Sequence, residues 1–431
     1  MIDGCTIVVD VGKTNAKASL WDTNGSQVDR RSRANQAGPA SDYRTLDVAG
    51  IDGFVLESLS ESATDAERED YLAQRDSFAE TGSPFLPLGL NLGLKLHRLE
   101  TILGPLPDDV TIVPWAQYWA WRLCGVAASE ISSLGCHTDL WRPMQNSYSH
   151  LADERGWSAR MAPLRSAGES LAPITPEVAA ATGLSTDCEV YCGLHDSNAA
   201  LLAARGHREI AEHDATVLST GTWFVAMRSL AAGANIQTDL LDEARDCLIN
   251  VDVYGNAVPS ARFMGGREAE VLGGVDSFAL TDNYDPDELL GRLPELIDNG
   301  ACGLPTFVMG VGPFPAATGT WINEPSDAKD KRAATGLYLA LMADTTLDLV
   351  GSCDQLLIEG RFAEAQVFVR ALATLRPQQN IYVSNAHNDV AYGALRLICP
   401  DLETPSKLTP VTPLDIDLSQ YAKQWRSRTQ Q

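Results

Sequence analysis

An acidic residue between two polar turns is the feature of this sequence that most directly suggests chemistry. Asp196 stands in the stretch Gly193–Asn198, just before the apolar run 199–204. A turn rich in hydroxyl groups follows at 219–222, and a similar turn at 12–15 ends the first apolar run of the chain. Backbone N–H groups in such turns can hold an anion, and a carboxylate can take a proton from an attacking hydroxyl. The pattern therefore suggests a site for a polyphosphate and for a nucleophile to be activated.

Each of these features also has a structural explanation. A carboxylate just before an apolar helix can accept hydrogen bonds from the first free N–H groups, so Asp196 also fits the role of an N-cap. Most turns with the composition of 12–15 bind nothing. The residues alone leave both alternatives open.

Strands and helices are predicted on both sides of these residues from apolar periodicity and turn signals. The expected strands lie at 5–11, 16–22, from 28 onward, 190–193, 248–263 as a hairpin, 306–312, 353–358 and 381–383, and the expected helices at 48–59, 92–103, 173–183, 331–350, 363–375 and 388–398. Each half of the chain has an apolar strand that breaks at a Gly/Thr turn. We therefore predict two domains, 1–205 and 206–431, which agrees with the limit on the size of a single core.

Composition excludes several classes of function. A net charge of −24 disfavours nucleic acid and anionic membrane surfaces as partners. Nine cysteines without a C-x-x-C pair fit reduced thiols better than a disulfide framework. We see no signal peptide and no apolar run of the ~18 residues that a spanning helix needs. We expect a cytoplasmic protein that binds neither nucleic acid nor membrane.

Four segments, taken together, resemble the motifs of the FGGY family of carbohydrate kinases, and most closely its rhamnulokinase- and fuculokinase-like branch. Residues 10–18 are similar to the family's first phosphate motif, 193–196 to its conserved acid, and 218–223 to its second phosphate motif. Residues 356–360 stand where the family has its adenosine motif. The order and the intervals of the four segments agree over nearly the whole chain.

The resemblance implies an α/β fold with two domains of the actin/hexokinase, ribonuclease H-like type. Each domain would be a mixed five-stranded sheet flanked by helices, with the active site in the cleft between the domains. The first domain, 1–205, would hold the sugar, and the second, 206–431, the nucleotide. ATP, Mg²⁺ and a small sugar are the implied ligands, the sugar being a ketose such as L-rhamnulose or L-fuculose. A homodimer is left open.

The resemblance also implies roles for single residues. Asp196 would act as the general base, His195 would contact the sugar, and Asp10 would hold Mg²⁺ through water. Lys17 is left between a phosphate contact and a structural ion pair, and Asn256 is a further candidate for binding the sugar or the nucleotide. The other assignments are Gly12, Lys13, Thr14, Asn15, Ser219, Thr220, Gly221 and Thr222 to the ATP phosphates, and Glu359, Gly360 and Arg361 to the adenosine side.

The chain departs from the family pattern in two places. We do not find the further first-domain strand, with its Gly/His turn toward the sugar, after 48–59, so Asn91 or the segment 137–141 is a candidate to complete the sugar pocket. A lone glycine, Gly360, stands where the family favours consecutive glycines. The alternative function is therefore a catalytically impaired relative that binds nucleotide or sugar. A dehydrogenase is disfavoured because no G-x-G-x-x-G follows the first strand.

Overall fold

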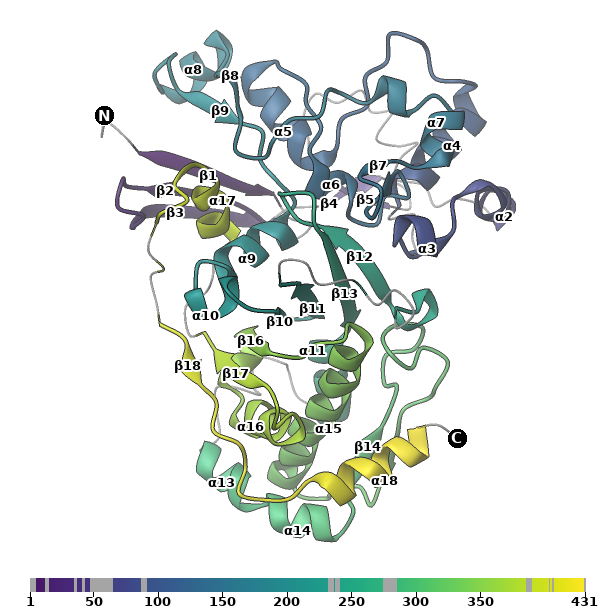
Figure 1. Ribbon diagram of the computed structural model, residues 1–431, viewed down its shortest axis with the longest axis vertical. Helices are drawn as coiled ribbons and strands as arrows, with labels where there is room; N and C mark the ends of the chain where they lie inside the picture. Colours follow the sequence, from purple (N-terminus) through teal and green to yellow (C-terminus); the bar gives the residue numbers. More distant parts are fainter. Residues whose placement is uncertain are drawn as a thin grey trace. The chain divides into compact units, whose positions relative to one another are not determined.

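The structure is a computed structural model, and its helices and strands are shown in Figure 1. It describes residues 5–11, 15–34, 37–40, 43–46, 65–86, 91–231, 236, 241–273, 285–384, 390–402, 404 and 407–429. The predicted helix at 48–59 and the turn residues Gly12, Lys13 and Thr14 lie outside the described residues.

The chain forms two compact units, each of which combines segments that are far apart in the sequence. The first unit consists of Met1–Ala203, Ile249–Ala257 and Asp389–Glu403, and the second of Ala204–Leu248, Val258–Asn388 and Thr404–Gln431. The first junction lies close to the boundary at 205 and 206 that we predicted. Two later segments belong to the first unit, although a linear division assigns them to the second.

An antiparallel meander opens the first unit, and it consists of β1 (Thr6–Val11), β2 (Asn15–Trp21) and β3 (Gln27–Ala34). The Asp22 carboxylate forms the turn between β2 and β3, because its Oδ1 accepts from the N–H groups of Asn24 and Ser26 at 2.9 and 2.8 Å. This is the turn that the Thr23-Asn24-Gly25 sequence predicts.

Short helices and strand pairs make up the rest of the first unit. The helices are α2 (Asp65–Gln74), α3 (Phe78–Thr81), α4 (Leu92–Leu103), α5 (Trp115–Cys124), α6 (Ile131–Leu134), α7 (His150–Glu154), α8 (Pro176–Thr182), α9 (Asp196–Ala204) and α17 (Val390–Ile398). The strand pairs are β4 (Ala37–Ala40) with β5 (Tyr43–Leu46), β6 (Trp141–Arg142) with β7 (Ser147–Tyr148), and β8 (Ser170–Pro173) with β9 (Glu189–Tyr191). Tyr71, Leu134 and Trp157 are fully buried in a hydrophobic core of this unit.

Local sequence explains where several helices begin and end. Helix α8 begins after Thr175, whose hydroxyl accepts from the Val178 N–H, and has a proline in its first turn. It ends at Gly183, whose φ of 74° lies in the left-handed region that favours glycine. The predicted helix at 92–103 is confirmed as α4, and the one at 173–183 is confirmed as α8.

A seven-stranded mixed sheet organises the second unit. Its strands, in spatial order, are β12 (Cys247–Val251), β13 (Ala257–Phe263), β11 (Phe224–Ser229), β10 (Ala215–Thr220), β16 (Gln355–Gly360), β17 (Asn380–Val383) and β18 (Thr409–Pro410). The pairs β10–β16 and β16–β17 are parallel. The expected five-stranded mixed sheet is therefore extended by a strand at each edge.

Helices cover this sheet, and most residues of α15 (Ala328–Leu349) are buried. Figure 1 shows α10 (Arg208–Ala211) on one side of β10 and β16, and α15 (Ala328–Leu349) with α16 (Gln366–Leu375) on the other. Helix α15 packs against α16 and against α11 (Gly265–Gly273). The remaining elements of this unit are α13 (Pro286–Gly291), α14 (Leu293–Asp298), α18 (Ser419–Thr429), η4 (Glu243–Arg245), η5 (Arg361–Glu364), β14 (Cys302–Leu304) and β15 (Thr320–Ile322).

The strand predicted at 306–312 is wrong. The strand in this region, β14, ends at Leu304, and residues 306–312 form bends and turns. Gly310 and Gly312 have φ values of 80° and 81°, which an extended strand does not allow. Apolar residues at 307–309 gave the pattern of a strand, but the flanking glycines and prolines decide the backbone.

Candidate active site

Asp196 is the first residue of α9, and its carboxylate does two things. Its Oδ1 accepts from the N–H of the next residue, Ser197, at 2.6 Å, which differs from an N-cap, whose side chain accepts from the second or third residue after it. The same oxygen lies 3.1 Å from Nδ1 of His195, and 58% of the Asp196 side chain is exposed. Asp196 is therefore an acid of the first turn rather than an N-cap; its negative charge favours the helix N-terminus, and its carboxylate still faces open space.

A large cavity in the first unit has Asp196 in its wall. It measures about 1310 Å³, and its polar side also includes Asp10 from β1 and His195. The rest of the wall is lined by apolar and aromatic side chains such as Trp115 and Trp119 of α5. A space of this kind, mostly apolar with a few converging polar groups, is typical of small-molecule sites.

Buried polar residues hold the segment that carries His195 and Asp196. Gln117 of α5 donates from Nε2 to the carbonyl of Gly193 at 3.1 Å. The hydroxyl of Ser132 accepts from the His195 N–H at 3.2 Å and donates to the Glu130 carboxylate at 2.6 Å. All three of these side chains are fully buried. Sequence reasoning missed Gln117, Glu130 and Ser132, although a lone Gln among aromatic and apolar residues is a signal that could have found Gln117.

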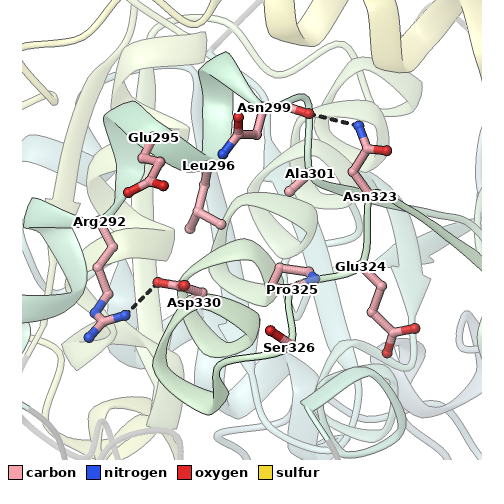
Figure 2. A pocket seen from close by; sticks show the side chains of 10 residues that line it. All are labelled: Arg292, Glu295, Leu296, Asn299, Ala301, Asn323, Glu324, Pro325, Ser326 and Asp330. Atoms are coloured by element: carbon pink, nitrogen blue, oxygen red, sulfur yellow. Dashed lines mark hydrogen bonds and ion pairs between the residues drawn. The ribbon is translucent and has the colours of Figure 1, made fainter.

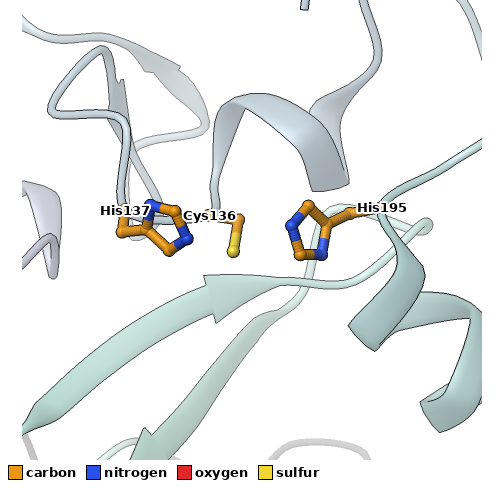
Figure 3. A group of neighbouring side chains, drawn as sticks. All are labelled: Cys136, His137 and His195. Atoms are coloured by element: carbon orange, nitrogen blue, oxygen red, sulfur yellow. The ribbon is translucent and has the colours of Figure 1, made fainter. Parts of the chain in front are cut away.

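A thiol lies between two imidazoles, as Figure 3 shows. The donor atoms of Cys136, His137 and His195 all lie within 4.8 Å of one another. Burial alone would raise the pKa of the Cys136 thiol, but His195 and His137 outweigh burial and lower that pKa to about 5. Burial alone would lower the pKa of His195, but the Cys136 thiolate and then Asp196 raise it to about 10. Near neutral pH a positively charged imidazole therefore faces Asp196.

Asp10 and Lys17 form an ion pair across the first two strands. They are opposite each other in the register of β1 and β2, and Lys17 Nζ lies 3.1 Å from Asp10 Oδ2. Of the two roles left open for Lys17, the structural pair is thus present. Asp10 remains in the cavity wall.

In the second unit, the 219–222 turn and the 359–361 segment lie side by side. Strands β10 and β16 run parallel, and Ser219 and Thr220 are opposite Glu359 and Gly360 at their carboxyl ends. The carboxyl ends of parallel strands are the usual place for ligands in α/β sheets. The structure therefore brings together two groups of residues that the sequence separates by more than a hundred positions.

Close backbone contact at this point depends on a glycine. A Cβ on Gly360 would lie 2.2 Å from the carbonyl oxygen of Thr220, and Gly360 has a φ of 86°. Thr220 is buried, and its hydroxyl accepts from the Phe362 N–H at 3.1 Å and donates to the Glu359 carbonyl. The Thr220 side chain thus ties the two strands together. Thr222 is exposed, so a ligand can reach its hydroxyl.

Helix α11 and an arginine support the same turn from the other side. The Gly266 N–H donates to the Thr222 carbonyl at 3.2 Å, and a Cβ on Gly266 would lie 2.2 Å from the Gly221 oxygen. The Arg262 guanidinium lies over the Trp223 ring, 4.7 Å from its centroid. The turn is therefore held in one conformation by its neighbours in the second unit.

Other predicted site residues lie away from the cavity or have partners of their own. Asn256 donates from Nδ2 to the Asp252 carboxylate at 3.1 Å, within the turn between β12 and β13. Asn91 is buried, and its side chain accepts from the Leu86 N–H and donates to the Pro84 carbonyl. Of the two candidates to complete the sugar pocket, only the 137–141 segment reaches the cavity wall, through its residues 137 and 138.

A second cavity, in the second unit, contains none of the predicted site residues. It measures about 540 Å³ and lies between α14 and the start of α15 (Figure 2). Arg292 Nη1 lies 2.5 Å from Asp330 Oδ1, and Asn323 Nδ2 donates to the Asn299 carbonyl at 2.7 Å. Because it contains none of the predicted site residues and some of its polar groups already bind one another, we do not regard it as the active site.

Comparisons with known proteins agree with this geometry. The family described as "Carbohydrate kinase FGGY, C-terminal domain" matches residues 212–406. The crystal structure of a carbohydrate kinase from Novosphingobium aromaticivorans is 47% identical, covers 98% of this chain and 100% of that chain, and has a TM-score of 0.91. No curated protein matches the sequence. None of the helices that the structure describes combines the length and apolar character needed to cross a membrane.

More distant structures share the fold alone. The xylulose kinase from Rhodospirillum rubrum is 17% identical, covers 98% of this chain and 97% of that chain, and has a TM-score of 0.74. The Plasmodium falciparum glycerol kinase with ADP is 11% identical, covers 99% and 98%, and has the same TM-score. The α/β fold of the actin/hexokinase type is confirmed. The 47% identity over nearly the full length shows that this chain belongs to the FGGY family of carbohydrate kinases.

Proposed function

We propose that the protein is an ATP-dependent kinase that phosphorylates one hydroxyl group of a small ketose, with Asp196 as the general base. The observation that carries this proposal is the exposed carboxylate of Asp196 in the wall of the large cavity. Asp196 takes the proton of the attacking hydroxyl while the sugar oxygen bonds to the γ-phosphorus of ATP. The bond between that phosphorus and ADP breaks, and the proton then passes from Asp196 to water.

A 6-deoxy-ketohexose such as L-rhamnulose or L-fuculose is the first substrate that we propose. Such a sugar has a methyl group at one end, and hydroxyl groups and one carbonyl group along the rest. Apolar side chains that line the cavity, among them Trp115, Trp119 and Leu123, suit the methyl group. His195 and His137 lie in the same wall and offer nitrogen atoms to the hydroxyl groups.

The nucleotide belongs, in this proposal, to the carboxyl ends of β10 and β16. Thr222 and the backbone of the 219–222 turn would contact the phosphates, and Gly360 with its neighbours Glu359 and Arg361 would lie on the adenosine side. Support comes from the register that puts these segments side by side and from the exposure of Thr222. Residues 12–15 with Lys17 are the further phosphate ligands that the family motif assigns.

Asp10 fits a role near Mg²⁺ that acts through water. Its carboxylate is in the cavity wall, and one of its oxygens, Oδ2, pairs with Lys17. The ion would bind mainly to water and phosphate oxygens, so a single carboxylate oxygen suffices on the protein side. When bound, Mg²⁺ neutralises charge on the transferred phosphate.

The test is an ADP-release assay over a panel of ketoses that includes L-rhamnulose, L-fuculose and D-xylulose. We expect Asp196→Asn to lower kcat by about 10²–10⁴-fold, because the amide cannot accept the proton. Sugar KM should change little, since the amide has nearly the same size as the carboxylate.

Glu177→Gln is the matched control for this experiment. Glu177 is an exposed acid in the first turn of α8, so its loss removes the same helix-terminal charge without touching the cavity. Equal turnover by the wild type and Asp196→Asn would reject Asp196 as the base. Binding of ATP and sugar in calorimetry, without turnover of any ketose by the wild type, would instead favour the impaired relative.

A further inference from the structure

Three metal-ligating side chains converge in the wall of the large cavity. Cys136 follows α6, His137 is its neighbour in the sequence, and His195 precedes α9 (Figure 3). One atom of each, the sulfur or a ring nitrogen, lies within 4.8 Å of the other two. All three residues line the cavity, and Cys136 is only 5% exposed.

This donor set suits a soft or borderline divalent cation. Zn²⁺ takes a cysteine sulfur at ~2.3 Å and histidine nitrogens at ~2.0–2.1 Å in tetrahedral geometry. Donor atoms of such an ion are roughly 3.3–3.6 Å apart, so modest side-chain rotations would close the group around it. Mg²⁺ does not suit these donors, because it prefers oxygen ligands. The cluster is thus chemically distinct from the site near Asp10.

Two details of the chain agree with a ligand in this position. Nδ1 of His137 is buried and has no hydrogen-bond partner in the part of the chain that the structure describes. A buried nitrogen of this kind costs free energy unless something binds it. His137 also has a φ of 43°, an uncommon conformation for a residue other than glycine, which lets adjacent residues 136 and 137 face one point.

We propose that Cys136, His137 and His195 bind a Zn²⁺-type cation whose fourth position opens into the cavity, and that this ion inhibits the kinase. Three protein ligands leave one position for water or for a ligand in the cavity. His195 lies beside Asp196, so a bound ion would fix His195 and occupy space that the acceptor needs. The inhibition rests on the proposed function, whereas the binding of the ion does not.

Co²⁺ titration of the full-length, chelator-treated protein tests the binding. A cysteine ligand gives bound Co²⁺ a thiolate charge-transfer band in the near ultraviolet, which a site of histidine and carboxylate ligands does not. The group formed by Asp76, Glu80 and His150, which also has metal-ligand spacing, therefore gives no such band. We expect one Co²⁺ per chain with the band, and displacement of Co²⁺ by Zn²⁺.

Two variants and one matched control decide which residues bind the ion. Cys136→Ser removes the sulfur and should abolish the band. His137→Asn removes one imidazole but keeps a residue type that tolerates positive φ, so it should fold and should weaken Co²⁺ binding at least tenfold. Cys192→Ser is the control, because Cys192 is a buried cysteine of the same cavity that is not in the cluster, and it should keep the band.

The kinase assay tests the inhibition separately. Micromolar Zn²⁺ should lower the wild-type rate at least tenfold, and EDTA should restore that rate. The rate of Cys136→Ser should fall little when the same Zn²⁺ is added. No band in the wild type, or an equal band in Cys136→Ser, would overturn the site. A band without inhibition of an active kinase would overturn the inhibitory role. If no ketose is phosphorylated at all, the proposed function fails, and the Co²⁺ titration still decides the site.

Discussion

Glu268 is a buried acid whose protonation links pH to the stability of the second unit. It lies on α11, is 1% exposed, and accepts a hydrogen bond from the hydroxyl of Tyr338. Burial raises its pKa from 4.5 to about 7, although Tyr338 and the N–H groups of Val308 and Phe307 act in the opposite direction. Folding thus favours the protonated form of Glu268. Its stabilising contribution is complete below about pH 4.5 and is lost as the pH rises through about 7.

Glu268→Gln should flatten the pH dependence of the unfolding free energy, because the glutamine side chain is uncharged at every pH. Between pH 5 and 8 the wild type should lose roughly up to 3 kcal/mol of unfolding free energy that the variant keeps. Urea unfolding at several pH values measures the difference. Glu270→Gln, on the same helix, removes a carboxylate that pairs with Arg267 at the surface and should leave the wild-type slope. Parallel slopes for wild type and Glu268→Gln would contradict the prediction.

The chemistry of single residues was predictable only where a motif carried it. Asp196 was found because an acid before an apolar run stands out, and it lies in the cavity wall. The Thr220 hydroxyl accepts a hydrogen bond from Phe362, which is far away in the sequence, so no local pattern could indicate this contact. Gln117 could be singled out in its apolar surroundings, but its bond to the Gly193 carbonyl comes from a separate helix and could not be predicted.

Elements with strong local signals were predicted well, and those that depend on distant partners were not. The strand predicted at 5–11 and the helix predicted at 331–350 correspond to β1 and α15. Helix α18 was not predicted, because most of its residues are polar. It is held by Tyr421 and Trp425, which donate to the carbonyls of Ala301 and Gly303 at 2.8 and 2.7 Å. Tertiary contacts therefore decide that helix.

Helices α9 and α17 pack so closely that one position requires glycine. A Cβ on Gly393 of α17 would lie 1.8 Å from the Ala199 oxygen of α9. Gly393→Ala should therefore cost about 1–3 kcal/mol of stability through overpacking. The added methyl group should push α9 away from α17. Because α9 begins with Asp196, this displacement of α9 should also lower kcat. Thermal unfolding and the ADP-release assay measure the two effects.

Gly291→Ala is the matched control for Gly393→Ala. Gly291 is the last residue of α13, and a Cβ there meets nothing within 4 Å. Alanine has the higher helix propensity, so this variant should be neutral or slightly more stable than the wild type. If both glycine variants unfold at the wild-type temperature, the close contact between α9 and α17 does not constrain the first unit.

At the scale of the whole molecule, the first unit is completed by a segment from near the end of the chain. Helix α17 contributes Ala391, Tyr392 and Leu395 to a core that also contains Val8 and Trp21. The segment Ile249–Ala257, which includes the turn between β12 and β13, belongs to the same unit, and Val251 is fully buried in the core that contains Tyr71 and Trp157. Linear sequence reasoning could not find this arrangement, because it assigns each segment to its neighbours along the chain.

Residues 1–205 expressed alone should therefore fail to form a stable unit. Without α17, the apolar side chains of Val8 and Trp21 lose their partners, and the β1–β3 meander loses the helix that packs on it. We expect the fragment to show no cooperative thermal transition by circular dichroism and to aggregate. The same fragment with residues 389–403 joined through a flexible Gly/Ser linker should regain part of that transition, because the missing core is restored. A sharp transition of the unmodified fragment near the wild-type temperature would show that α17 is dispensable for the first unit.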